Sequence, residues 1–219
     1  MIAAKNENGK IVWSWHIWIT DIPDDQIYQN DLGVFTVQDR NLGATRADRG
    51  AGDQWYESTG LDFQWGRKDP FAGGHLLATN QYYTISDFIL HPTVWANDWE
   101  KGVSYWSPDQ KTIYDPCPVG YRVASRDIWN NFSVSGTFEN GWYFAYNENG
   151  DLAWYPNRAR AYDDRTEYWG DGYLLASNHD SGLYYASGTV RTQDNDTGNL
   201  RCMKDENATS VTVKIQSVN

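Results

Sequence analysis

The sequence predicts an α+β protein of small antiparallel sheets, many loops and few short helices. Short runs of β-branched and aromatic residues recur along its 219 residues, and clusters of Gly, Asn, Asp and Pro separate them. Aromatic residues make up 16% of the chain, with 12 Trp and 15 Tyr, which is typical of β-rich folds and of flat binding faces. No internal repeat, coiled coil or low-complexity linker divides the chain. We therefore expect one domain over residues 1–219.

In the N-terminal half, Asn8-Gly9 indicates a turn, and the β-branched and aromatic run Ile11–Thr20 after it predicts a mostly buried strand. Residues 21–31 are expected to form a polar loop, and Val34–Gln38 a second strand. Residues 45–61 are rich in Gly, Asp and Arg and read as a loop. Residues 72–110 look irregular, with at most short helical pieces.

The C-terminal half begins with a short strand at Tyr121–Ala124. Ser125 is a good N-cap for a helix over 125–132, in which Ile128, Trp129 and Phe132 would share a buried face. Asn149-Gly150 marks the turn of a β-hairpin formed by residues 141–146 and 151–155. Further strands are expected at 168–177, 182–187, 200–204 and 210–216.

Charge and hydropathy exclude two classes of partner. The net charge of −11 and the absence of clustered Lys and Arg argue against binding to nucleic acid phosphates. No apolar run approaches the roughly 18 residues that a membrane-spanning helix needs.

The N-terminus has no signal-peptide core and looks like a start cut into a longer protein. We therefore expect the chain to be the C-terminal module of that longer protein.

Nothing in the sequence identifies a catalytic or metal centre. The four His residues are scattered, and neither a nucleophile elbow nor a Gly-rich phosphate loop is present. No Asp-rich stretch fits the frame of a calcium loop, although a structural Ca²⁺ held by loop carboxylates and carbonyls stays open. We therefore expect a non-enzymatic protein without a cofactor.

The cysteines lie in two conspicuous phrases, Asp115-Pro-Cys-Pro-Val-Gly and Asn199-Leu-Arg-Cys-Met-Lys. The surroundings of Cys117 lack the basic neighbours and the helix N-terminus that would activate a thiol. A Cys117–Cys202 disulfide in an extracellular setting is the favoured interpretation, and two buried free thiols are the alternative. Such a bond would stabilise the fold by roughly 4–5 kcal/mol, because it closes a long loop.

Residues 154–196 are dense in aromatic, Asn and Asp side chains. Rigid rings beside adaptable hydrogen-bonding groups are typical of surfaces that bind proteins or sugars. The alternative is that half of these rings belong to the core. The candidate ligand-binding residues are Trp154, Tyr155, Asn157, Tyr162, Asp163, Tyr168, Trp169, Asn178, His179, Asp180, Tyr184, Asp194 and Asn195.

Several phrases resemble the Fibrobacter succinogenes major paralogous domain. Asp115–Ser125 with Trp129 is similar to its Cys-Pro-x-Gly-Trp-x-Val-Pro-x-x-x-x-Trp signature, and Tyr168-Trp169 to its Tyr-Trp-Ser-Ser. Gly198–Asp205 is similar to its closing Ser-Val-Arg-Cys-Val-Lys-Asp. Three upstream segments resemble fimbrillin-like surface proteins of gut Bacteroidetes: Trp13–Asp21, Asp39–Ala44 and Gln64–Phe71.

The resemblance implies a C-type lectin-like fold that binds a ligand rather than catalysing a reaction. It places the protein outside the cell, on a bacterial surface or a phage particle, with a glycan or a surface protein of another cell as partner. Variable proteins of diversity-generating retroelements share this fold and this composition of the binding face. The Trp-Asn-Asp motif of calcium-dependent lectins is absent from the C-terminal region, so calcium-dependent sugar binding is not implied. The alternatives are a structural fimbrial or adhesin subunit and an enzyme of the formylglycine-generating-like group.

Overall fold

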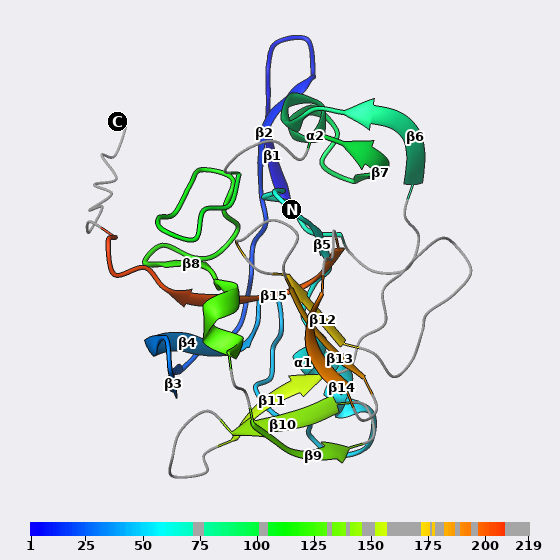
Figure 1. The fold of residues 1–219 in the computed structure, drawn as a ribbon. Coiled ribbons are helices and arrows are strands. Elements are labelled where there is room, and N and C mark those ends of the chain that lie inside the picture. The colour runs from blue at the N-terminus through cyan, green and yellow to red at the C-terminus, as the bar shows by residue number, and fades with distance from the viewer. Residues whose placement is uncertain are drawn as a thin grey trace, which may run out of the picture.

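The computed structural model describes most of the N-terminal two thirds of the chain and the strands of the remainder. The described residues are 1–71, 77–100, 105–130, 133–138, 141–145, 152–156, 172–175, 177, 182–186, 189–193 and 197–208. They form small, mostly antiparallel sheets with few short helices, which confirms the α+β class (Figure 1).

The central element is β15 (Thr197–Lys204), which is buried along nearly its whole length. It pairs antiparallel with β4 (Gly33–Asn41), β5 (Phe63–Gln64) and β8 (Tyr121–Val123), and parallel with β12 (Gly172–Leu175). The sheet continues from β12 through β13 (Gly182–Ala186) to β14 (Thr189–Gln193), and from β4 to β3 (Asp25–Asn30). Strands from distant parts of the sequence therefore meet on β15.

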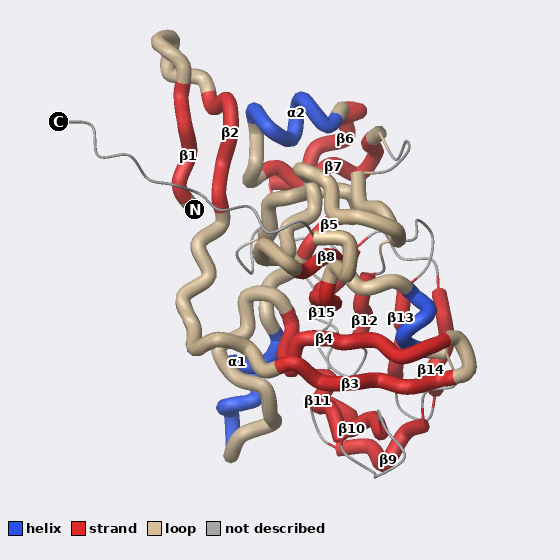
Figure 2. Tube along the Cα trace, turned by 90° about the vertical axis from the view of Figure 1, so that its left-hand side faces the viewer, coloured by secondary structure: helices blue, strands red, loops and turns tan. Residues whose placement is uncertain are grey.

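Three smaller units surround this sheet in Figure 1. The first is the three-stranded sheet of β9 (Ser133–Phe138), β10 (Gly141–Ala145) and β11 (Leu152–Pro156), in which β10 and β11 are the predicted hairpin. The second is a parallel pair, β6 (Leu77–Tyr83) and β7 (Val94–Trp99), joined through α2 (Ile85–Leu90). The third is the hairpin of β1 (Ile2–Lys5) and β2 (Ile11–Trp15), which stands beside α2 in Figure 2.

The hydrophobic core lies on both sides of β15. One cluster gathers Tyr28, Val37, Ala124, Ile128, Trp129, Ala153, Tyr155 and Met203. The other gathers Leu42, Phe63, Trp65, Trp106, Cys117, Val123, Leu200 and Cys202. Alternate residues of β15 enter the two clusters, because side chains of a strand point to opposite faces in turn.

The prediction of a mostly buried strand over Ile11–Thr20 is wrong. The strand ends at Trp15, and only Ser14 among these residues is buried. Val12 and Trp15 are 47% and 49% exposed, and Ile19 beyond the strand is 83% exposed. A two-stranded hairpin has no second layer to cover both of its faces, so β-branched composition alone did not ensure burial.

Local structure also appears where loops were expected. β3 lies within the expected loop 21–31. Its Tyr28 is 1% exposed, and burial of this side chain in the core explains why a strand forms here. The expected loop 45–61 contains a 3₁₀ turn (Gly52–Trp55) and α1 (Tyr56–Thr59). β6, α2 and β7 fall in the supposedly irregular segment 72–110.

The helix expected after Ser125 is only a 3₁₀ turn over Arg126–Trp129, and the Ser125 side chain makes no capping hydrogen bond. Ile128 and Trp129 are buried as predicted, while Phe132 lies outside the described residues. The Asn149-Gly150 turn and the strand expected at 210–216 also lie outside them.

Candidate functional site

Three of the candidate ligand-binding residues lie on described strands: Trp154 and Tyr155 on β11, and Tyr184 on β13. Tyr184 lies on β13, where it is the register partner of Tyr173 on β12. Ten of the predicted site residues lie outside the described part of the chain: Asn157, Tyr162, Asp163, Tyr168, Trp169, Asn178, His179, Asp180, Asp194 and Asn195.

Trp154 and Tyr155 are core residues, which corrects the prediction that they contact a ligand. Their exposed fractions are 2% and 0%. The Trp154 indole Nε1 donates to Ser58 Oγ at 2.9 Å, and the hydroxyls of Tyr155 and Tyr28 lie 2.7 Å apart. Burial and the neighbouring Tyr155 raise the pKa of Tyr28 well above its ordinary value. Buried rings whose polar ends are hydrogen-bonded fix β11 in place.

Arg201 of β15 joins this aromatic pair to the central sheet. Its guanidinium carbon lies 4.0 Å from the centre of the Tyr155 ring, as in a cation–π contact. Its Nη2 donates to the Trp154 carbonyl at 2.9 Å, and its Nε donates to Asn41 Oδ1 at 3.1 Å. The side chain is 1% exposed, so β4, β11 and β15 share one buried polar network.

The Cys117–Cys202 disulfide is confirmed, with its Cα atoms 5.8 Å apart. The Asp115 carboxylate holds the turn that presents Cys117. It accepts from the backbone N–H of Cys117 at 2.9 Å and of Val123 at 2.8 Å, and from Lys111 Nζ at 2.8 Å. The bond and this carboxylate fasten the residues around β8 to β15. Sequence reasoning missed Asp115, although Asp directly before Pro-Cys is a recognisable turn signal.

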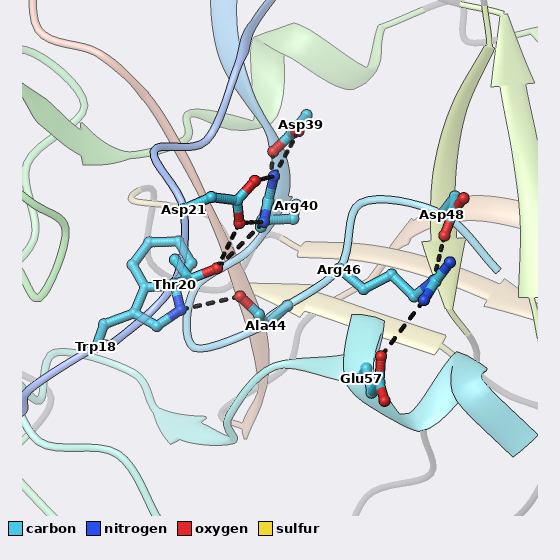
Figure 3. Close-up of polar contacts among 9 residues, drawn as sticks. All are labelled: Trp18, Thr20, Asp21, Asp39, Arg40, Ala44, Arg46, Asp48 and Glu57. Carbon is cyan, nitrogen blue, oxygen red and sulfur yellow. Dashed lines mark hydrogen bonds and ion pairs between the residues drawn. The ribbon is translucent and has the colours of Figure 1, made fainter. Parts of the chain in front are cut away.

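A second fixed point lies at the end of β4, where Arg40 is clamped between two carboxylates (Figure 3). Arg40 binds Asp39 through Nε and Nη2 at 2.8 and 3.0 Å, and its Nη1 contacts Asp21 at 2.6 Å. These hydrogen bonds raise the pKa of Arg40 and lower that of Asp21. Trp18 Nε1 donates to the Ala44 carbonyl at 2.9 Å in the same region. The segment Asp39–Ala44 therefore has a structural role, because it attaches the end of β4 to the residues around Trp18 and Asp21.

Ser14, Lys68 and Asp69 form a buried trio that superficially resembles a nucleophile and its activating groups. Ser14 Oγ donates to Asp69 Oδ2 at 2.8 Å, and Lys68 Nζ donates to the same oxygen at 2.6 Å and lies 2.5 Å from Ser14 Oγ. An ammonium group that donates to a carboxylate cannot serve as a general base, and Ser14 is only 2% exposed. The trio attaches β2 to the segment after β5.

The described residues give no further sign of catalytic or metal chemistry. Within them, no three His, Cys, Asp or Glu side chains converge on a common point that could hold a metal ion. No helix found in the same residues has the length and hydropathy to cross a membrane.

Comparison with known proteins identifies no relative. No family model, no curated protein and no solved structure matches the chain.

Proposed function

We propose that the protein is a non-enzymatic ligand-binding module with a C-type lectin-like fold, of the kind found in the Fibrobacter succinogenes major paralogous domain. Its binding face is the aromatic, Asn- and Asp-rich segment 157–196. The ligand is a glycan or a protein on the surface of another cell. The module acts outside the cell, on a bacterial surface or a phage particle.

The observation that carries this proposal is that a buried strand lies on each side of segment 157–196 in the sequence. Before it, Trp154 and Tyr155 are buried and hydrogen-bonded on β11. After it, β15 is buried and holds the Cys117–Cys202 disulfide. A variable or adaptable surface needs supporting strands that do not change with it. The binding loops of antibody domains, for example, are carried by a constant β-sandwich. The same arrangement would suit a variable protein of a diversity-generating retroelement.

The disulfide supports the extracellular assignment, because such bonds persist in oxidising compartments. Chelation tests directly whether ligand binding requires Ca²⁺. Binding should survive EDTA if the ligand contacts are aromatic and amide groups alone.

The test is a binding screen against glycan arrays and intact bacterial cells. A variant with Tyr162→Ala, Tyr168→Ala and Trp169→Ala should lose most of the signal. Tyr56→Ala is a matched control, because Tyr56 is 51% exposed but lies outside the segment. Equal binding by the triple variant and the control, with both folded by circular dichroism, would refute the assignment of the face.

A structural subunit of a fimbria or adhesin is the second candidate. It is favoured by exposed apolar side chains along the β1–β2 hairpin and the residues after it, where Ile2, Trp15, Ile19 and Ile22 are 59%, 49%, 83% and 90% exposed. Large exposed apolar surface is typical of protein interfaces. Sedimentation velocity separates the candidates, since a structural subunit should associate with its own kind and bind no array ligand.

A further inference from the structure

The carboxyl ends of β6 and β7 bring together side chains that the binding face proposed above does not use. The two strands are parallel, so both end at the same edge of their sheet. Tyr82 and Asp98 are register partners near this edge, and Glu100 follows β7 directly. The Glu100 backbone N–H donates to the Tyr83 carbonyl at 2.8 Å, which fixes Glu100 beside the end of β6.

Two further tyrosines reach this edge from the segment that follows. The Tyr105 hydroxyl lies near the Glu100 carboxylate, and its ring meets the Tyr114 ring edge-on with centroids 5.3 Å apart. Tyr105 packs closely on Gly66, where an added Cβ would lie 3.0 Å from a carbon of the ring. Burial, Glu100 and the nearby hydroxyls of Tyr114 and Tyr82 raise the pKa of Tyr105. Tyr105 is thus held in place, while Tyr82 is 57% exposed.

The two acidic side chains described at this edge, Asp98 and Glu100, carry negative charge. The Glu100 carboxylate accepts from the Ile85 backbone N–H at 3.2 Å, and Asp98 is exposed. Among the ion pairs between described residues, none involves Asp98 or Glu100. Tyrosine faces attract cations through the ring quadrupole, and nearby carboxylates add charge complementarity.

We propose that Tyr82, Asp98, Glu100, Tyr105 and Tyr114 form a second ligand site, which binds an arginine side chain of a partner peptide. A guanidinium group fits both features, because its plane stacks on an aromatic ring while its edge donates to carboxylates. A neutral sugar would use the rings but would leave the two acids without a charged partner. This site is independent of the face at 157–196, so either proposal can fail without the other.

The test is an NMR titration of the whole chain with the peptide acetyl-Gly-Arg-Gly-amide. Its citrulline analogue, which has nearly the same shape without the charge, is the matched control ligand. We expect the arginine peptide to bind and the citrulline peptide not to bind. Tyr82→Ala should weaken binding about 2- to 5-fold, the range of a cation–π contact at an exposed site, whereas Tyr82→Phe should retain it. Glu100→Gln should weaken binding and reduce its dependence on salt.

Three results would overturn the proposal. One is equal affinity for the arginine and citrulline peptides, and another is unchanged affinity after Tyr82→Ala. The third is equally tight binding of the corresponding lysine peptide, which would remove the argument for guanidinium stacking. Both Tyr82 variants should fold normally, because the side chain is largely exposed, and the unshifted resonances of the core verify this directly.

Discussion

Removing the disulfide by Cys117→Ala and Cys202→Ala is expected to destabilise the protein strongly. The two cysteines are 85 residues apart, so their bond restricts a large loop of the unfolded chain. The chain-entropy relation gives about 4.6 kcal/mol for a loop of this length at 25 °C. Ala would also leave a small cavity, because Cys117 and Cys202 are 5% and 0% exposed.

Urea unfolding monitored by tryptophan fluorescence measures this loss. The midpoint should fall and the slope with denaturant should rise, because the unlinked unfolded chain exposes more surface. Reduced wild-type protein should behave like the double variant, which controls for the cavity. A loss below about 1 kcal/mol, with an unchanged slope, would refute the view that this bond is a main support of the fold.

The other predictions concern the buried polar network and the turn before Cys117. Arg201→Met should lower the free energy of unfolding in urea by about 2–4 kcal/mol, because two buried acceptors lose their donor. A change near zero would show that an apolar side chain at this position stabilises the fold as well as the polar network does. Asp115→Asn should cost about 1–3 kcal/mol, since an amide cannot accept all three hydrogen bonds of the carboxylate, whereas the exposed Asp109→Asn should have no measurable effect. Burial and the hydrogen bond donated to Asp25 raise the pKa of Tyr121 from 10 to about 12. The stabilisation from this neutral hydroxyl is complete below pH 10 and is lost as pH rises through about 12, so the stability difference between wild type and Tyr121→Phe should shrink over that interval.

Local signals in the sequence predicted those parts of the fold that local interactions determine. The β10–β11 hairpin, β8 and the strand around Cys202 follow from turn residues and β-branched runs. β3 was missed because its stability depends on Tyr28, whose hydroxyl meets Tyr155 from a distant part of the chain. No local pattern encodes that pairing. β2 was predicted to be buried because its composition is apolar. In the structure few other elements pack against it, so most of its side chains stay partly or fully exposed.

The same distinction applies to the candidate site. Composition identified an aromatic, polar segment, but it could not separate rings that support the surface from rings that form it. Trp154 and Tyr155 belong to the core, because Ser58, Tyr28 and Arg201 meet them from other elements. The segment predicted as a binding face therefore begins after β11. The cysteine pairing was predictable because only two cysteines are present.

The position of β15 has a consequence for how the protein forms during synthesis. Its partners come from residues 37–41, 63–64, 121–123 and 174–175, so each of them stays without this partner until residues 197–204 have left the ribosome. Sheets whose pairings span long stretches of sequence also form slowly. The nascent chain must therefore stay soluble with its strand edges exposed, and oxidation of Cys117 must await the same late segment.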